Sequence, residues 1–574
     1  MKKLIIIICI LFLSIIGYSL FERSTSFPAL EDIEFDKGSK IEIEKLNNDQ
    51  IKNLKLLGQT WGFLKYYHSQ IAAGLYNWDY ELFRILPPVL QAKDKSELDK
   101  ILIKWIGSLG EFEKGKTEKY NQSDIKVEPD LSWIKQSGFS SELSELLIDI
   151  QDSKKAKDHY YISLLPNVGN PKFKNEKAYA DMKYPDAGFR LLSLYRYWNI
   201  IQYYFPYIYL IEEDWNMVLE EFIPKVIAAK NEMEYNLVIL ELITRVQDTH
   251  ANITGENASI KKYFGDRKSA LKVSFVEDKA LIVDYYHDEF GKETGLQIGD
   301  IIESVNGILV SQIIENQLKY TPASNYTIKL RNIARNLLKS NDGLLQIDYI
   351  RNGEKGRKSI LTYSAEELDI KNQAKDSSFK MISKDIAYIH HGALKRAHLP
   401  IIWKEIKNTK GLIIDCRNYP SDFPLFSLSI LLMPKPYPFV KFSNPKIESP
   451  GHFIFVDAIE VGKNNKKHYQ GKVIILVNEV SQSSSEYHAM AYRVHPNATV
   501  IGSTTAGADG NISRFSLPGG IKTRITGIGV YYPDGTETQR IGIIPDIEMN
   551  PTIKGIREGR DELMEKAIEV IMEK

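Results

Sequence analysis

Cysteine is nearly absent from this chain of 574 residues, since Cys9 and Cys416 are the only two. If the N-terminal segment that carries Cys9 is removed, no internal disulfide can form, and buried apolar cores must stabilise the fold. An excess of one charge is also lacking, because 74 basic side chains are balanced by 74 acidic ones. A chain of zero net charge gives no electrostatic reason to expect a nucleic-acid partner.

The chain also lacks an apolar run of comfortable membrane-spanning length. The run Leu4–Gly17 is too short for that role. It follows Lys2 and Lys3 and precedes the small residue Ser19, which is the layout of a secretory signal peptide. We therefore expect a signal peptide over residues 1–19 and an exported protein, in the periplasm or at the cell surface, without a stable membrane span after cleavage. Retention of this segment as an anchor is the alternative.

Metal-binding motifs are missing too. The 11 histidines are scattered, with no His-x-x-x-His pair and no pair of cysteines close in sequence. We expect neither a metal nor another cofactor. The length is that of about three or four domains. The patterns below predict a multidomain α+β protein with an N-terminal helical repeat region, a small β domain and a C-terminal α/β core.

Two aromatic stretches repeat in one register. The aligned pairs are Trp61 with Trp198, Tyr66 with Tyr203, Tyr67 with Tyr204, Trp78 with Trp215, Leu82 with Leu219 and Pro87 with Pro224. This register predicts a duplicated helix–turn–helix unit, with a first helical domain over residues 20–165 and a second over 180–256. The helical spacing of the aromatics favours core packing over a ligand platform. The second unit ends in Asp248-Thr249-His250, which is either half of a proton relay or, more simply, a helix cap.

Strand patterns replace the helical ones from Ala270 onward. A turn Gly295-Leu296-x-x-Gly299-Asp300 precedes an apolar strand and an Asn306-Gly307 hairpin. This order resembles a PDZ domain over residues 268–365, in which Gly295, Leu296 and Gly299 would serve peptide binding. Such domains bind an extended peptide as an added strand at the sheet edge. Another small β domain with an Asn-Gly hairpin is the alternative.

The last third, residues 378–574, alternates strands with helical crossovers, which predicts a mainly parallel sheet. Val473–Val477 is a continuous aliphatic run typical of a strand buried on both faces. A serine-rich turn follows and leads into a helical pattern. Free N–H groups and the helix dipole favour negative charge at that point, which suits a nucleophile and an oxyanion hole. An ordinary serine N-cap is the simpler interpretation.

Five motifs in this third carry a family resemblance. They are Tyr388-Ile389-His390, Gly411–Pro420, Val477–Glu486, Val500–Gly507 and Gly542–Asp546. Their order behind a PDZ-like domain resembles the C-terminal processing (tail-specific) serine peptidases and the tricorn core, and most of all the tricorn-related extracytoplasmic branch. The resemblance implies an exported peptidase that hydrolyses proteins or peptides through an acyl-enzyme, with PDZ-assisted recognition of peptide ends. The alternative is an inactive peptide-binding or scaffold protein on the same fold.

The resemblance also implies roles for single residues. Ser483 would be the nucleophile, and the oxyanion donors would be the Ser484 N–H and the turn at Ser421-Asp422. The family usually has a glycine pair at that turn, so its two side chains are a departure.

At the position of the general base this sequence departs most from the family pattern. Ala508 stands where tail-specific peptidases have a lysine, which excludes a Ser–Lys dyad. The tricorn-like match gives His390 as the base, and Gln539 stands at the position of the family's glutamate. Glu537, two residues away, would orient the base instead. The further candidates are His250, His391 and Lys395. Retention of Ser483 and His390 favours the peptidase, whereas Ala508 and Gln539 favour the inactive scaffold.

Overall fold

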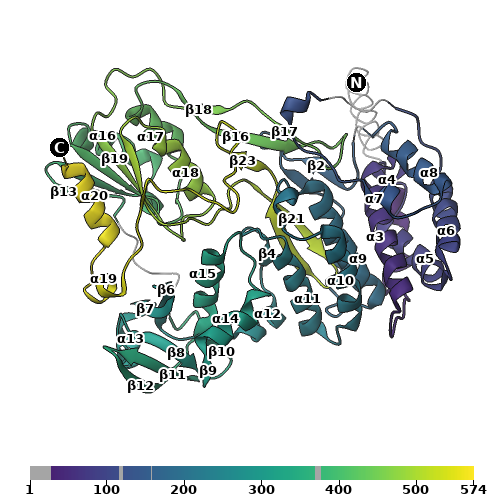
Figure 1. The fold of residues 1–574 in the computed structure, drawn as a ribbon, viewed down its shortest axis with the longest axis horizontal. Coiled ribbons are helices and arrows are strands. Elements are labelled where there is room, and N and C mark those ends of the chain that lie inside the picture. The colour runs from purple at the N-terminus through teal and green to yellow at the C-terminus, as the bar shows by residue number, and fades with distance from the viewer. Residues whose placement is uncertain (1–26, 116–119, 157, 369–376, 574) are drawn as a thin grey trace, which may run out of the picture.

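The computed structural model describes residues 27–115, 120–156, 158–368 and 377–573. The expected signal peptide lies outside these ranges. Figure 1 shows a helical region on the right, a β domain at the bottom and an α/β core at the upper left. Within the described ranges, no helix is long and apolar enough to cross a membrane.

The α/β core is built on one six-stranded sheet. Its strand order is β13 (Phe379–Ser383), β14 (Ile386–His390), β15 (Gly411–Asp415), β19 (Lys472–Val477), β20 (Ala498–Gly502) and β24 (Ile547–Glu548). All pairs from β14 to β24 are parallel, and β13 is an antiparallel edge. One face packs against α16 (Leu399–Ile406), α17 (Leu425–Leu432) and α18 (Ser484–Arg493), and the other against α20 (Glu562–Met572). Burial on both faces explains the unbroken aliphatic runs and confirms the predicted parallel sheet.

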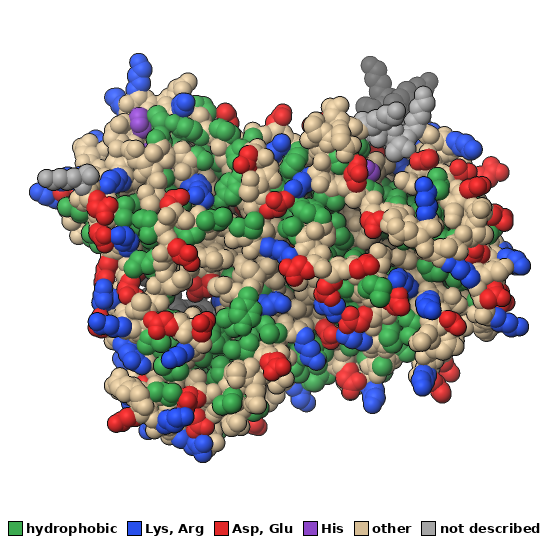
Figure 2. All heavy atoms as spheres, viewed as in Figure 1, with side chains coloured by type: hydrophobic (Ala, Val, Ile, Leu, Met, Phe, Trp, Pro, Cys, Tyr) green, Lys and Arg blue, Asp and Glu red, His purple; other side chains and the backbone are tan. Residues whose placement is uncertain are grey.

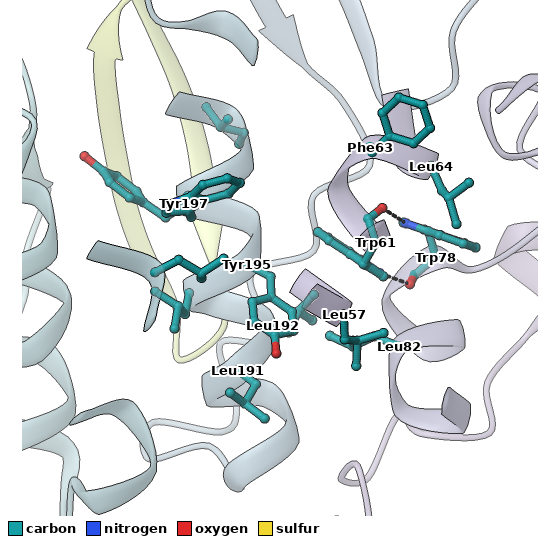
Figure 3. Packing of buried hydrophobic residues seen from close by; sticks show 14 of the residues in the cluster. Leu57, Trp61, Phe63, Leu64, Trp78, Leu82, Leu191, Leu192, Tyr195 and Tyr197 are labelled. Carbon is teal, nitrogen blue, oxygen red and sulfur yellow. Dashed lines mark hydrogen bonds between the residues drawn. The ribbon is translucent and has the colours of Figure 1, made fainter. Parts of the chain in front are cut away.

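The helical region packs around two equivalent tryptophan pairs. Its main helices are α3 (Asn48–Tyr67), α5 (Trp78–Gln91), α6 (Lys95–Ser108), α8 (Ser141–Gln151), α9 (Ala187–Tyr204), α10 (Trp215–Ala228) and α11 (Glu232–Arg245). Trp61 and Trp78 each donate the indole N–H to the other's backbone carbonyl at 2.9 Å (Figure 3). Trp198 and Trp215 make the same reciprocal bonds at 2.7 and 3.1 Å. Because buried indoles need such acceptors, these aromatics serve the core, as their spacing predicts.

The β domain is a six-stranded antiparallel sheet. Its order is β12 (Glu354–Leu361), β11 (Leu344–Arg351), β8 (Ile301–Val305), β7 (Lys279–Tyr285) and β6 (Leu271–Val276), with β9 (Ile308–Leu309) paired to β8. Helix α15 (Tyr326–Leu337) packs along the edge strand β6. Gly295 and Gly299 take φ of +71° and +92°, which suits glycine, and Leu296 is buried. The Gly299 carbonyl accepts a 3.0 Å hydrogen bond from Arg557 of α19 (Ile553–Arg557), so a C-terminal helix covers this turn.

Two small sheets join the helical region to the C-terminal third. In one, β1 (Ile125–Val127) pairs with β17 (Phe453–Phe455), which pairs with β16 (Tyr437–Pro445). In the other, β21 (Ile512–Leu517) pairs with β22 (Ile521–Thr526), which pairs with β4 (Asn252–Thr254). Phe515, Leu517 and Ile525 thereby belong to the core of the helical region. The sequence-based boundary at residue 378 therefore does not separate two independent cores.

Candidate active site

Ser483 lies at a strained turn between β19 and α18. Its φ is +54° and its ψ is −120°, a backbone conformation that residues other than glycine rarely adopt. Such strain persists only where the surroundings hold the turn, and it is concentrated at functional sites. The Ser483 N–H donates to the Glu486 Oε2 at 3.0 Å and to the Ala508 carbonyl at 3.1 Å. The side chain of Ser483 is half-buried at the carboxyl edge of the parallel sheet.

The flanking serines have a structural role. The hydroxyls of Ser481 and Ser485 both donate to the Cys416 carbonyl, at 2.7 and 2.6 Å. They tie the turn to the end of β15 and are fully buried. Of the three alternating serines, only Ser483 has some exposure to solvent.

Glu486 holds the turn from the first turn of α18. Its carboxylate accepts from Thr505 Oγ1 at 2.5 Å, from the N–H groups of Gly507 and Ala508 at 2.8 and 3.2 Å, and from Ser483. Burial raises the pKa of Glu486, and these four hydrogen bonds oppose that rise. Burial and then the charge of Glu486 raise the pKa of neighbouring Asp509 well above its usual range. The turn Thr505–Ala508 is thus fixed beside Ser483.

A second polar group approaches the same turn from the helical region. Thr249 Oγ1 lies 3.3 Å from the Ala506 carbonyl, and the Ala506 N–H donates to Ser481 at 2.9 Å. The residue after Thr249 is His250, which is 4% exposed. The end of the helical region and the serine turn are therefore hydrogen-bonded to one short segment.

Thr526 links His250 to a carboxylate. The Thr526 hydroxyl lies 2.9 Å from His250 Nδ1 and 3.0 Å from Asp248 Oδ1, and the Thr526 N–H donates to Asp248 Oδ2 at 2.8 Å. Because the carboxylate can only accept, the hydroxyl donates to Asp248 and accepts from Nδ1–H. This arrangement assigns the proton of the neutral imidazole to Nδ1 and leaves Nε2 as the acceptor. Burial lowers the pKa of His250, with Asp248 opposing, so the ring is neutral near pH 7.

His390 lies on the other side of the sheet. Ile389 packs with the helices that include α18, whereas Tyr388 packs with α20. Because strand side chains alternate, His390 shares the α20 face with Tyr388. In addition, β15 separates β14 from β19, a lateral distance of about 10 Å between strand axes. The strand that carries His390 therefore does not direct it toward the start of α18.

His391 packs against α18 instead. Its ring lies 4.4 Å from that of His488, and the pair is buried. His488 Nδ1–H donates to the Ser484 carbonyl at 2.5 Å. Burial lowers the pKa of His488 to about 4 and that of His391 well below its usual range. Lys395 is exposed, at the start of a short 3-10 turn.

The two residues near the family's glutamate position point in different directions. Glu537 forms an ion pair with Lys126 at 2.5 Å and accepts from Tyr209, so it is directed toward the helical region and β1. The expectation that Glu537 orients the base conflicts with these contacts. Gln539 is 1% exposed, and its Nε2 lies 3.5 Å from both Asp248 Oδ1 and Ser324 Oγ. Gln539 thus borders the Asp248–Thr526–His250 group.

The two expected oxyanion donors differ in their surroundings. The Ser484 N–H, at the first position of α18, makes no hydrogen bond to the described part of the chain. Asp422 instead accepts from the Arg396 N–H and its neighbour Phe423 N–H, both at 2.7 Å, which lowers its pKa. Ser421 Oγ lies a long 3.5 Å from the Leu394 carbonyl. Among the described residues, no group of three His, Cys, Asp or Glu side chains is placed to hold a metal.

The comparisons with known proteins identify the core. Residues 385–549 match the model of Peptidase family S41. The match covers most of the α/β core and supports a serine-type peptidase. Ser483 and Gln539 lie inside the matched range, whereas Asp248 and His250 precede it. No significant match to a curated protein was found.

Solved structures of mature CPAF share the fold of this chain at low sequence identity. Mature CPAF complexed with lactacystin is 14% identical, with a TM-score of 0.53, over 67% of this chain and 98% of that chain. A structure of mature CPAF alone is 15% identical, with a TM-score of 0.52, over 67% and 96%. The tricorn protease is 16% identical, with a TM-score of 0.33, over 67% and 36%.

Sequence reasoning did not find two contributors to the site. Thr526 stands on a strand that pairs with β4, and no local motif marks it. Glu486 follows Ser483 by three residues, which is the spacing of a capping box, and that signal was available.

Proposed function

We propose that Ser483 is the nucleophile and His250 the general base of this S41 peptidase. The observation that carries the proposal is the Asp248–Thr526–His250 group, whose neighbour Thr249 is hydrogen-bonded to the same turn as Ser483. A general base needs a neutral imidazole whose second nitrogen is held by a partner, and His250 meets both requirements. His390 is replaced as the candidate base because of its sheet face.

The reaction follows from this arrangement. The Ser483 hydroxyl attacks the peptide carbonyl while its proton passes to His250 Nε2. The carbonyl oxygen becomes an oxyanion near the Ser484 N–H and the positive end of α18. The imidazolium then protonates the leaving amine, which departs and leaves an acyl-enzyme on Ser483. Water, deprotonated by His250, hydrolyses the ester and restores the serine.

The β domain supports a proposal on substrate binding. We infer that it is PDZ-like and binds an extended peptide along β6. A groove of about 370 Å³ lies between the end of β6 and α15, and its lining includes Arg331 and Glu479. Arg331 donates to the Glu479 carbonyl at 2.7 Å and to Gln482 at 3.1 Å. A peptide in this groove would therefore lie next to the serine turn, outside the cytoplasm if the expected signal operates.

A serine-directed fluorophosphonate tests the proposal. We expect the probe to label wild type at Ser483, located by peptide mass analysis, and to label His250→Ala far more slowly. The matched control is His391→Ala, which alters another buried histidine near α18. Absence of labelling and of peptide hydrolysis in wild type would favour the inactive scaffold.

A further inference from the structure

One face of the β21–β22–β4 sheet collects positive charge beside the proposed base. Arg514 and Arg524 are directly opposite each other in the β21–β22 register, and Lys522 follows on the same face. Along β22, Thr526 follows Arg524 on the same face, and its hydroxyl is hydrogen-bonded to His250. The opposite face is apolar and packs into the helical core. In Figure 1, β21 and β4 lie at the middle of the molecule, between the α/β core and the helices.

The charge of these cations is not neutralised by ion pairs within the described part of the chain. Arg514, Lys522 and Arg524 form no ion pair with a carboxylate among the described residues, although Arg524 Nε donates to the His250 carbonyl at 2.9 Å. Burial and then the charge of Arg514 lower the pKa of Arg524, while Asp248 and Tyr419 raise it. Elsewhere the arginines of a sheet are paired, as Arg357 is with Asp348 at 2.5 Å. Figure 2 shows charges of both signs interspersed over the visible face.

Two like charges opposite each other destabilise an antiparallel pair. Folding therefore gives no reason for Arg514 to stand across from Arg524. The bond from Arg524 Nε to the His250 carbonyl places this charged face beside the proposed base. A chain bound at Ser483 would pass this face.

We propose that Arg514, Arg524 and Lys522 form a specificity site for acidic side chains of the substrate, close to the cleaved bond. This inference rests on the proposed function. Alternate residues of β22 are about 7 Å apart, which is also the spacing of alternate side chains in an extended peptide. A guanidinium binds a carboxylate through two parallel hydrogen bonds, which favours Glu or Asp over their amides. The site therefore selects peptides that carry acidic residues two positions apart.

Peptide binding to the variant Ser483→Ala tests this inference without cleavage of the peptide. The probes are short fluorescein-labelled peptides of Ala, Leu and Ser that differ only in carrying two Glu or two Gln residues, two positions apart. We expect the Glu peptide to bind about tenfold more tightly at low salt, and this preference to shrink as salt rises. In Arg514→Gln the ratio should fall toward one. In Arg514→Glu it should reverse, so that the Gln peptide binds more tightly than the Glu peptide.

Arg560→Gln, which changes an arginine paired with Glu558 and Glu565, is the control and should keep the wild-type ratio. Arg524 is left unchanged because it also holds His250. Equal binding of the Glu and Gln peptides, or a preference that survives in Arg514→Gln, would overturn the inference. Either result leaves fluorophosphonate labelling of Ser483 intact, so failure here is distinct from failure of the proposed mechanism.

Discussion

The two sides of the proposed active site are built in opposite ways. On the serine side, Ser483 and Glu486 are 3 residues apart on one strand–turn–helix unit. On the histidine side, Asp248 and Thr526 are 278 residues apart, and Gln539 is 291 residues from Asp248. Local sequence patterns therefore point to the serine side. The histidine side exists only after two distant segments pair as β22 and β4.

The largest expected effects compare the two sides directly. Ser483→Ala and His250→Ala should each lower kcat/KM by roughly four orders of magnitude or more, because nucleophile and base act as one unit. The double variant should lose little beyond either single one. His390→Ala should remain near wild type, since that side chain lies on the α20 face. Steady-state kinetics on a short peptide measure all four, and equal losses in His250→Ala and His390→Ala would remove the contrast.

Thr526→Val tests the link on the histidine side. The hydroxyl is lost without a change in shape, so His250 is no longer held in one tautomer. We expect kcat to fall by roughly 10- to 100-fold while KM changes little. Thr523→Val is the matched control, since its hydroxyl donates to the Asn252 carbonyl at 2.9 Å on the opposite face of the same strand. A kcat loss shared by both variants would mean that the sheet, and not the His250 contact, is responsible.

Glu486→Gln tests the serine side. Its amide can no longer accept all four hydrogen bonds, and a buried donor is left unpaired. The free energy of unfolding should fall by about 1–3 kcal/mol. Chemical denaturation measures that change, and fluorophosphonate labelling should slow as the Ser483 turn relaxes. Unchanged stability and labelling would show that Glu486 is dispensable to the turn.

The pH dependence of kcat/KM sharpens the choice of base. Because burial lowers the pKa of His250, the base is neutral above that pKa and is lost as pH falls through it. The acidic limb should thus lie below about 6.5, the ordinary histidine value. Thr526→Val should shift that limb, whereas Thr523→Val should leave it in place. A limb well above 6.5 in wild type would contradict the assignment.

The smallest expected effect concerns stability in acid. His488 has a pKa of about 4 in the folded protein, below the ordinary value, so the unfolded chain binds the proton first as pH falls. Stability should therefore decrease between pH 6.5 and about 4, with about 2 kcal/mol from this group at pH 5. Thermal unfolding of His488→Gln should show a weaker decrease than wild type. His468→Gln, at a half-buried loop histidine, should match wild type.

Sequence reasoning succeeded where one segment carries the information. The strands at Val473–Val477 and Gly411–Asp415 and the parallel sheet agree with the structure. It was least informative about the direction in which individual side chains point. The motif that contains His390 does not reveal which sheet face the ring occupies. Sequence spacing alone likewise predicted that Glu537 lies near the base. In the structure Glu537 forms an ion pair with Lys126, which comes from a stretch without a recognisable motif, and is directed away from the base.

The pairing of β22 with β4 also sets when the active site becomes complete during synthesis. A ribosome that has just extended the chain past α18 has already made Ser483, Asp248 and His250. The hydroxyl of Thr526, which holds the imidazole in one tautomer, is still to be added. The same holds for Phe515 and Ile525, which fill the helical core. A nascent or C-terminally truncated chain thus carries Ser483 without the fully assembled proposed base, so the proposed hydrolytic site is completed only near the end of translation.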